Sequence, residues 1–366
     1  MAINVLFLCP LKGNGGIQSW VKNMLTYFED SDCHLYHVDT APDKPFPQFK
    51  KYDAWYYGIK SFVKVFWKVR RLMRATPQIQ LMHTTTSGGT GSLRDYVLGK
   101  VCKRKGLKLI LHCHFGTVGE LYDDQSWRGR VFRNALMIYD QIWVLDQHSA
   151  SYLKSKEALK DKVFLTPNPI TVSQISTLKT KSYRKIGYVG NLYPSKGVFE
   201  LVKAVRDLGD DTELMIAGLG NDENISKIKE TAQDDYGKRI HYLGWLSNED
   251  ALALIDSLDI MCLPTYYELE AFPISILEAM CRGKLIISCA RVAIPDMLTS
   301  DDGTSCGILV KEKSSQAIAD AIKWCQEHPD EADQMCIKAY NKVYTSYRDD
   351  IVYRLYMSNY NHAISK

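Results

Sequence analysis

Residues 263–280 read LPTYYELEAFPISILEAM, and this stretch decides how the rest of the chain is interpreted. It opens at the end of an apolar strand and closes with apolar residues that recur at helical spacing. Glu270 falls in the connecting loop, and Glu278 falls inside the apolar helix. An isolated buried carboxylate is costly, so we expect Glu278 to be paired or hydrogen-bonded. A sugar or ribose diol is a natural partner, because it offers two donors to two carboxylate oxygens.

The same change from strand to helix recurs along the whole chain. The expected strands of the first half are residues 4–9, 34–38, 81–84, 108–112, 141–145 and 163–166. Those of the second half are residues 185–189, 213–217, 239–243, 259–263, 284–288 and 307–310. Strands that alternate with helices form parallel sheets covered on both faces. Two successive series of strands therefore predict two doubly wound α/β domains.

Length and composition agree with this interpretation. The chain has 366 residues, enough for two domains, and it is 46% hydrophobic and 24% charged, as in ordinary globular proteins. The periodicity breaks between residues 167 and about 183, and residues 332–366 are expected to be helical. We expect no transmembrane helix, no signal peptide and a cytoplasmic location. The ten cysteines include no C-x-x-C pair, so we expect them to be reduced and structural.

The charge is unevenly distributed. Residues 1–165 carry a net charge of +10 and residues 166–366 a net charge of −6, so the first half is expected to face an anion. An expected helix at residues 59–74 contributes to this excess. Its basic stripe is Lys60, Lys64, Lys68 and Arg71, and its apolar stripe is Ile59, Phe62, Phe66, Val69 and Met73. Such a helix could lie on anionic lipid, or it could face the core with a solvated side. No nucleic-acid recognition motif accompanies it.

Three glycine-rich loops follow expected strands. They read KGNGGI at residues 12–17, GNLYPSKG at 190–197 and AGLG at 217–220. Glycines at strand ends let backbone N–H groups approach a phosphate, although each loop could also be a plain tight turn. A dinucleotide fingerprint is not complete in the first loop, because Gln18 stands where the last glycine would fall.

Two further loops of the first half carry candidate side chains. The segment HCHFG at residues 112–116 suggests either a polar core histidine or half of a metal site, and no third ligand is apparent. The segment HTTTSGGTG at 83–91, with Arg94 beyond it, could line an acceptor site or be a flexible loop. The acidic triplets at 30–32 and 301–303 are expected to be polar turns, so no metal site is predicted there.

Glu270 and Glu278, with seven residues between them, resemble the E-x7-E motif of the family-4 retaining glycosyltransferases (glycosyl transferases group 1), which have the GT-B fold. Three further segments match motifs of that family in the same order: Gly15-Gly16, Lys196-Gly197 and Pro167-Asn168. The resemblance covers nearly the whole chain. It implies two Rossmann-like doubly wound domains that face a central cleft. Residues 1–168 would bind the acceptor, residues 169–345 the nucleotide sugar, and a helix at 346–366 would pack back on the first domain.

The resemblance also implies roles for individual residues. Glu278 would bind the ribose, Glu270 the transferred sugar, and Lys196 the diphosphate. The implied catalytic residues are His114, Glu270 and Lys196. The implied donor-binding residues are Gly15, Gly16, Asn191, Lys196, Gly218, Gly220, Glu270, Phe272, Pro273, Ile274 and Glu278. Ser87 and Arg94 are the acceptor-side candidates. The chain departs from the family pattern at Asn191, where an arginine is usual, and Glu268 competes with Glu270 for the role of the first glutamate.

The function that the resemblance implies is retaining transfer of a hexose-type sugar. The donor would be a UDP- or GDP-sugar, and the acceptor a glycan or polyprenyl-linked hydroxyl in bacterial surface polysaccharide synthesis. No metal or other cofactor is expected, and a lipid-linked acceptor would explain contact with the inner membrane. The alternative is a GT-B-like protein that binds a nucleotide sugar without transferring it, or an epimerase. An epimerase needs acid–base carboxylates for elimination, which this loop does not provide.

Overall fold

The computed structural model describes residues 2–13, 15–29, 31–42, 51–89, 91–172, 182–209 and 211–366, without the side chains of residues 51–57. Asn14, Asp30, Thr90 and most of the expected boundary segment, residues 173–181, lie outside these ranges. The chain divides into two compact units. Unit 1 is Met1–Asn168 together with Val352–Lys366, and unit 2 is Pro169–Ile351.

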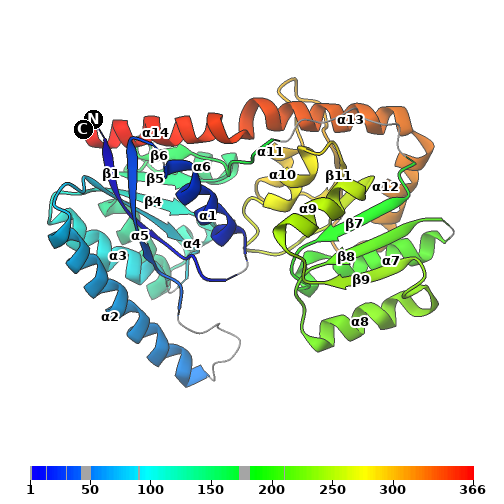
Figure 1. The fold of residues 1–366 in the computed structure, drawn as a ribbon, viewed down its shortest axis with the longest axis horizontal. Coiled ribbons are helices and arrows are strands. Elements are labelled where there is room, and N and C mark those ends of the chain that lie inside the picture. Colours follow the sequence, from blue (N-terminus) through cyan, green and yellow to red (C-terminus); the bar gives the residue numbers. More distant parts are fainter. Residues whose placement is uncertain are drawn as a thin grey trace. The chain divides into compact units, whose positions relative to one another are not determined.

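Unit 1 is built on a six-stranded parallel sheet of order β2-β1-β3-β4-β5-β6 (Figure 1). Its strands are β1 (Ile3–Cys9), β2 (Cys33–Asp39), β3 (Leu81–Thr86), β4 (Lys108–Cys113), β5 (Gln141–Val144) and β6 (Val163–Leu165). Its helices are α1 (Gly16–Phe28), α2 (Lys51–Ala75), α3 (Gly91–Lys103), α4 (Val118–Asp123), α5 (Trp127–Ile138) and α6 (Gln147–Lys154). The direction of winding reverses between β1 and β3, so the ends of these two strands form the topological switch point of the unit.

Both faces of this sheet are buried, because successive strand residues point to opposite sides. Leu6 and Leu8 of β1 belong to one core cluster together with residues of α2, α3 and α5. Phe7, between them, packs on the other side against Trp20 of α1 and His83 of β3, at centroid distances of 5.8 and 5.4 Å. The two layers of helices thus cover the sheet from both sides.

Unit 2 repeats the plan with a six-stranded parallel sheet of order β12-β11-β10-β7-β8-β9. Its strands are β7 (Lys185–Val189), β8 (Glu213–Ala217), β9 (Ile240–Gly244), β10 (Ile260–Leu263), β11 (Leu285–Cys289) and β12 (Ile308–Val310). Its α-helices are α7 (Val198–Leu208), α8 (Asp222–Ala232), α9 (Asn248–Ser257), α10 (Ile274–Met280), α11 (Ile294–Met297), α12 (Ser315–Glu327) and α13 (Pro329–Lys342). Two short 3-10 helices, η2 (Pro194–Lys196) and η3 (Gln233–Asp235), and a π-helix, η4 (Val343–Tyr347), complete it. Here the winding reverses between β7 and β10.

The last helix, α14 (Asp349–Ser365), is fixed to unit 1 by buried polar side chains. The hydroxyl of Tyr356 donates to the carbonyl oxygen of Pro167 over 2.9 Å. The side-chain amide of Gln141 donates to the carbonyl oxygen of Asn359 over 2.8 Å. These hydrogen bonds satisfy polar groups that would otherwise be buried without partners.

The fold predicted from the sequence is confirmed. All twelve expected strands occur, with ends shifted by at most two residues, and both sheets are parallel. The ten cysteines, all within the described ranges, are buried, and none of them forms a disulfide. In the apolar stripe predicted for the basic helix, Val69 is buried, whereas Ile59 is 44% exposed. No described helix has both the length and the hydropathy that spanning a membrane requires.

Candidate functional site

Two loops meet at the switch point of unit 2. One follows β7 and contains η2, and the other follows β10. Lys196 at the end of η2 forms an ion pair with Glu270 of the second loop, and their side chains are only 16% and 9% exposed. Ligands of doubly wound folds bind at this position, outside the carboxyl ends of the strands where the winding reverses. The structure thus joins two predicted site residues that lie 74 positions apart.

The loop after β10 is folded around the Glu270 carboxylate. The fully buried Thr265 donates its hydroxyl to Glu270 over 3.0 Å and accepts the backbone N–H of Tyr267 over 3.2 Å. The backbone N–H of Glu270 in turn donates to the carbonyl oxygen of Tyr267. Burial and the nearby Glu270 charge raise the pKa of Tyr188, which keeps this phenol protonated. Glu270 is therefore held by its surroundings before any ligand arrives.

The two loops are also joined directly. The backbone N–H of Tyr266 donates to the carbonyl oxygen of Ser195 over 2.8 Å. The ammonium of Lys196 lies 5.2 Å from the ring centroid of Tyr267, within the range of a cation–π contact. Together with the ion pair, these contacts fix the position of the lysine.

Two glycines make the close approach of these loops possible. Gly197 has a φ of 75°, and a Cβ there would lie 2.2 Å from the carbonyl oxygen of Pro264. Gly218 has a φ of 150°, and a Cβ there would lie 1.8 Å from the carbonyl oxygen of Gly190. At Gly220, another predicted residue, a Cβ would lie 2.8 Å from the side chain of Leu192. Any larger residue at these positions would push the strand-end loops apart.

Glu278 differs from Glu270 in its surroundings. It lies on α10 and is half-buried, and burial raises the pKa of its carboxyl while Arg282 opposes the shift. Among the described residues, no side chain or backbone group hydrogen-bonds or ion-pairs with this carboxylate. Glu268, the alternative to Glu270 as first glutamate of the motif, is exposed. Glu278 thus offers acceptor oxygens to a ligand.

The remaining donor-side candidates surround these residues. Phe272 is 6% exposed and packs edge-on against Tyr347 at 5.4 Å, and Pro273 caps α10 while Ile274 begins it. Asn191 accepts the hydroxyl of Tyr188 on its carbonyl oxygen over 2.8 Å. No described residue hydrogen-bonds with its side chain, which therefore remains open to a ligand.

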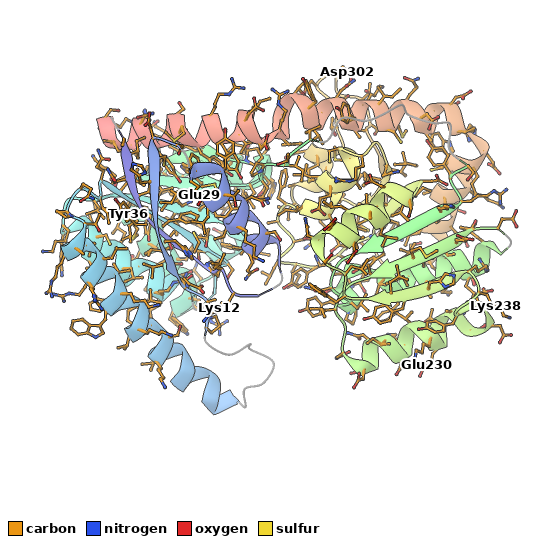
Figure 2. The ribbon with its side chains drawn as sticks, viewed as in Figure 1. Lys12, Glu29, Tyr36, Glu230, Lys238 and Asp302 are labelled. Carbon is orange, nitrogen blue, oxygen red and sulfur yellow. The ribbon has the colours of Figure 1, made fainter. Side chains whose placement is uncertain are left out.

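In unit 1, the predicted glycine loop connects β1 to α1. Gly15 is the residue before α1 and has extended backbone, and Gly16 begins the helix. A Cβ at Gly15 would lie 2.7 Å from the side-chain oxygen of Gln18. Lys12, labelled in Figure 2, is exposed in the same loop. The loop is thus tight around Gln18, the residue that breaks the dinucleotide fingerprint.

His114 follows β4 and is 8% exposed. Its ring lies 4.1 Å from that of His112 and 4.7 Å from that of Trp20. Burial lowers the pKa of His114 to about 3, so the ring is neutral near neutral pH. Its Nε2 has no hydrogen-bond partner in the described part of the chain. A neutral, unsatisfied ring nitrogen can donate to or accept from a ligand hydroxyl.

Behind His114 runs a buried chain of hydrogen bonds. Thr166 donates to the carbonyl oxygen of Val144, so its oxygen accepts from Nε2 of His112 at 3.4 Å. Nδ1 of His112 then accepts from Nε2 of His83 at 3.3 Å, and Nδ1 of His83 accepts the Tyr360 hydroxyl at 2.6 Å. Burial lowers the pKa of both histidines well below their usual range. Each ring needs one protonated and one bare nitrogen for this chain, so it is complete only when both are neutral.

The two acceptor-side candidates behave differently. Ser87 is exposed in the loop after β3. Arg94 donates to the buried carboxylate of Asp95 at 2.8 and 2.9 Å and to the carbonyl oxygen of Thr85 at 3.3 Å. Its guanidinium therefore already satisfies groups of its own unit.

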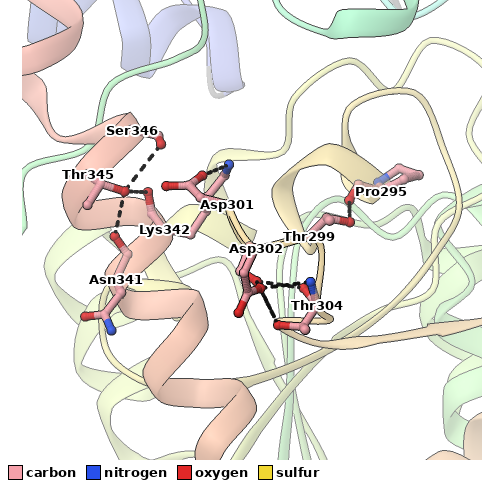
Figure 3. Close-up of polar contacts among 10 residues, drawn as sticks. Pro295, Thr299, Asp301, Asp302, Thr304, Asn341, Lys342, Thr345 and Ser346 are labelled. Atoms are coloured by element: carbon pink, nitrogen blue, oxygen red, sulfur yellow. Dashed lines mark hydrogen bonds and ion pairs between the residues drawn. The ribbon is translucent and has the colours of Figure 1, made fainter.

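The second acidic triplet is the polar turn expected from the sequence. Asp302 accepts the backbone N–H and the hydroxyl of Thr304 at 2.9 and 2.6 Å, as well as the hydroxyl of Ser300 (Figure 3). Asp301 accepts from the Lys342 ammonium at 2.7 Å. These hydrogen bonds hold the pKa of Asp302 well below its usual range. Within the described ranges, no group of three or more histidine, cysteine or acidic side chains could hold a metal ion.

Comparison with known sequences assigns the second half of the chain. The sequence model of the family described as "Glycosyl transferases group 1" matches residues 171–342, which contain both E-x7-E glutamates and Lys196. Residues 171–342 are a Glycosyl transferases group 1 domain.

Curated relatives of this glycosyltransferase domain carry related names. An uncharacterised glycosyltransferase of Methanocaldococcus jannaschii is 31% identical over 39% of this chain and 36% of its own length. The D-rhamnosyltransferase WbpZ of Pseudomonas aeruginosa is 28% identical over 43% of this chain and 41% of its own length. The chain thus matches about two fifths of the length of these relatives.

Solved structures match the fold of the entire chain. Sucrose-phosphate synthase of Thermosynechococcus elongatus has a TM-score of 0.75 at 16% identity and covers 99% of both chains. HepE of Anabaena, solved in complex with UDP and glucose, has a TM-score of 0.72 at 15% identity and covers 98% of this chain and 100% of its own. The fold is GT-B, with one Rossmann-like sheet in each unit.

Some residues that shape the site of the glycosyltransferase domain were not singled out from the sequence. Thr265 holds Glu270, and Tyr267 contacts Lys196. Both lie within residues 263–280. The sequence feature that could have identified them is a hydroxyl and an aromatic side chain just before the loop carboxylate. The pairing of Lys196 with Glu270 had no local signal, since it depends on β7 and β10 being neighbours in the sheet.

Proposed function

We propose that this chain is a retaining hexosyltransferase. It would move a sugar from a UDP- or GDP-sugar to a hydroxyl of a glycan or polyprenyl-linked acceptor in bacterial surface polysaccharide synthesis, without a bound metal or other cofactor. The observation that carries the proposal is the buried Lys196–Glu270 ion pair at the switch point of unit 2. It lies inside the segment that matches the glycosyltransferase family.

On the donor side, each acidic residue has a separate task. Glu278 would accept the ribose hydroxyls, a role supported by its open carboxylate. Glu270 would accept hydroxyls of the transferred sugar, and its fixed hydrogen bond from Thr265 supports a positioning role. Asn191, Gly218, Gly220 and residues 272–274 would complete the donor site.

Lys196 would stabilise the leaving diphosphate. An ammonium group has three N–H donors, and Glu270 engages one of them, so two remain for phosphate oxygens. Negative charge grows on the diphosphate as the sugar leaves, and a fixed cation in a partly buried site stabilises that charge effectively. Because Asn191 stands where an arginine is usual in the family, Lys196 would carry more of this task.

Unit 1 would supply the remaining groups. The unsatisfied Nε2 of His114 would hydrogen-bond with the transferred sugar, and Gly15 and Gly16 would leave room for the diphosphate. Ser87 and Arg94 stay the proposed acceptor-side residues. A relative from Campylobacter jejuni, 36% identical over 25% of this chain, is named for a diphospho-undecaprenol acceptor, which supports a lipid-linked acceptor and a cytoplasmic enzyme that meets the membrane.

The test is incubation of the purified chain with radiolabelled UDP- and GDP-sugars and an extract of polyprenyl-linked glycans. We expect one donor to label the lipid fraction, and nuclear magnetic resonance of the product to give the anomeric configuration of the donor. Tight binding of a nucleotide sugar without transfer or hydrolysis of any donor would contradict the proposal.

A matched pair of variants tests the site in the same assay. Glu270→Gln should lower turnover roughly 100-fold, because the sugar and Lys196 lose their fixed position, while nucleotide binding changes less. Glu268→Gln changes an exposed glutamate two positions away and should leave turnover unchanged. If the two variants turn over equally, Glu270 does not have the proposed role.

A further inference from the structure

Helix α2 has a second apolar side that the described residues of unit 1 leave exposed. Ile59, Val63 and Trp67 are 44%, 45% and 59% exposed, and they follow one another at intervals of four residues. Residues at this spacing lie on one side of a helix. Large exposed apolar side chains that gather on one side indicate an interaction surface.

The side of α2 that packs on the sheet is distinct from this one. Val65 and Val69 are 2% and 0% exposed and belong to the core cluster of the unit, with Phe62 and Phe66 packed against it. Core packing therefore accounts for one side of the helix only.

Basic side chains flank the exposed apolar residues. Lys60, Lys64, Lys68 and Arg71 are all exposed, and the guanidinium of Arg70 lies 5.6 Å from the Trp67 ring centroid. The described side chains of α2, residues 58–75, include six lysines and arginines and no acidic residue. We call Ile59, Lys60, Val63, Lys64, Trp67, Lys68 and Arg71 the outer face of α2.

The charge extends beyond this helix. Core residues of α2, α3 and α5 belong to one cluster, so the three helices cover the same face of the sheet (Figure 1). Helix α5 carries three arginines and no acidic residue, and its Trp127 and Met137 are 52% and 51% exposed. The acidic residue of α3, Asp95, is buried and paired with Arg94. The layer of helices thus presents positive charge and apolar side chains together.

We propose that the outer face of α2 docks on an anionic lipid bilayer. Aliphatic and indole side chains enter the boundary between headgroups and acyl chains, while the neighbouring lysines meet anionic headgroups. Charge complementarity selects the anionic bilayer. A nucleic acid would use the same lysines, but its bases would stack on aromatic rings. Ile59 and Val63 are aliphatic and provide no stacking surface.

This inference is independent of the proposed reaction, because lipid binding is measured without a donor or acceptor. The test is sedimentation of the full chain with vesicles of phosphatidylcholine alone or mixed with phosphatidylglycerol. We expect binding to the mixed vesicles only, with weaker binding at high salt.

Three variants separate the contributions. Changing Lys60, Lys64 and Lys68 to glutamate should weaken partitioning into the mixed vesicles at least roughly 100-fold. The same change at Lys203, Lys229 and Lys323, exposed lysines of unit 2, should have little effect although the change in net charge is identical. Trp67→Ser should weaken binding while keeping the charge. Circular dichroism verifies that each variant is folded.

Two results would overturn the proposal. One is equal binding of the wild type to both kinds of vesicle, or to neither. The other is binding of single-stranded RNA that the three α2 lysine changes abolish, with vesicle binding unaffected by them. The latter would assign the face to a nucleic acid.

Discussion

Two carboxylates with seven residues between them have opposite electrostatic surroundings. Glu270 is 8% exposed, paired with Lys196 and hydrogen-bonded by Thr265. A buried ion pair of this kind is costly to break, since removing one partner leaves the other charge buried alone. Glu278 is half-buried and meets no hydrogen-bond donor among the described residues, and the pKa of its carboxyl is raised. The first glutamate is thus part of the framework, and the second is available for a ligand.

This difference predicts the effect of removing Glu278. Glu278→Ala should weaken the binding of UDP or GDP by about 1.5–3 kcal/mol, which corresponds to one lost hydrogen bond to a charged group. The stability of the free protein should change little, because the lost carboxylate has no partner to leave unsatisfied. Isothermal titration calorimetry measures the binding, with Glu268→Ala as the control. Unchanged affinity would exclude the ribose role.

At this scale, the spacing of the motif was sufficient to prefer Glu270 over Glu268, and their burial agrees with that preference. The sequence argument expected Glu278 to be paired or hydrogen-bonded, with a sugar or ribose diol as its natural partner. No described residue of the chain takes that place, and the ribose role stays a prediction. Arg94 was selected as an acceptor-side residue, but its neighbour Asp95 engages the guanidinium.

The elements that decide the site are short. Helix η2 ends at Lys196, and Gly197 turns the chain into α7 with a left-handed backbone. The loop after β10 leaves no room for a side chain at Gly197, because a Cβ there would lie 2.2 Å from the carbonyl oxygen of Pro264. Lys196 therefore reaches Glu270 only because the next residue has no side chain.

Gly197→Ala tests this constraint. Left-handed backbone costs about 1–2 kcal/mol for a residue with a Cβ, and forced contacts in a packed region cost about 1–3 kcal/mol more. Gly303→Ala is the control, because Gly303 has a φ of 80° and open space around its Cβ position. In urea unfolding, the Gly197 variant should lose more stability than the control and should also lose donor binding. Equal losses would show that the contact with Pro264 relaxes freely.

Elements could be predicted from sequence more completely than their contacts. The runs of apolar and β-branched residues located each strand, because a strand buried on both faces leaves such a run. The order of strands in the sheets does not follow from periodicity, and the Lys196–Glu270 pair depends on it. Ile59 of α2 was grouped with the apolar stripe of its helix because its spacing fits, and spacing alone does not distinguish a core-facing side from an exposed apolar side.

At the scale of the whole molecule, the two units distribute charge and titratable groups differently. Unit 2 contains the ion pair and both motif glutamates. Unit 1 contains three neutral histidines, His83, His112 and His114, buried between the sheet and the helices α1 and α14. The hydrogen bonds that run from Tyr360 through His83 and His112 to Thr166 form only while both rings are neutral.

This arrangement predicts that unit 1 loses stability in mild acid. The pKa of each of the three histidines is lower in the folded state than the ordinary value of 6.5, so the unfolded chain binds more protons below that pH. Stability should be constant well above pH 6.5 and fall as the pH drops below it. Three such groups give a loss of up to about 4 kcal/mol between about pH 7.5 and about pH 5.5.

Urea unfolding followed by tryptophan fluorescence measures this dependence, because Trp20 and Trp143 pack against these histidines. His114→Gln should reduce the loss by about one third, since it removes one of three proton sites and leaves the Tyr360–Thr166 chain intact. His148→Gln, which changes an exposed histidine of α6, should leave the pH dependence as it is. Equal unfolding midpoints of the wild type at both pH values would mean that protons reach the rings without opening unit 1.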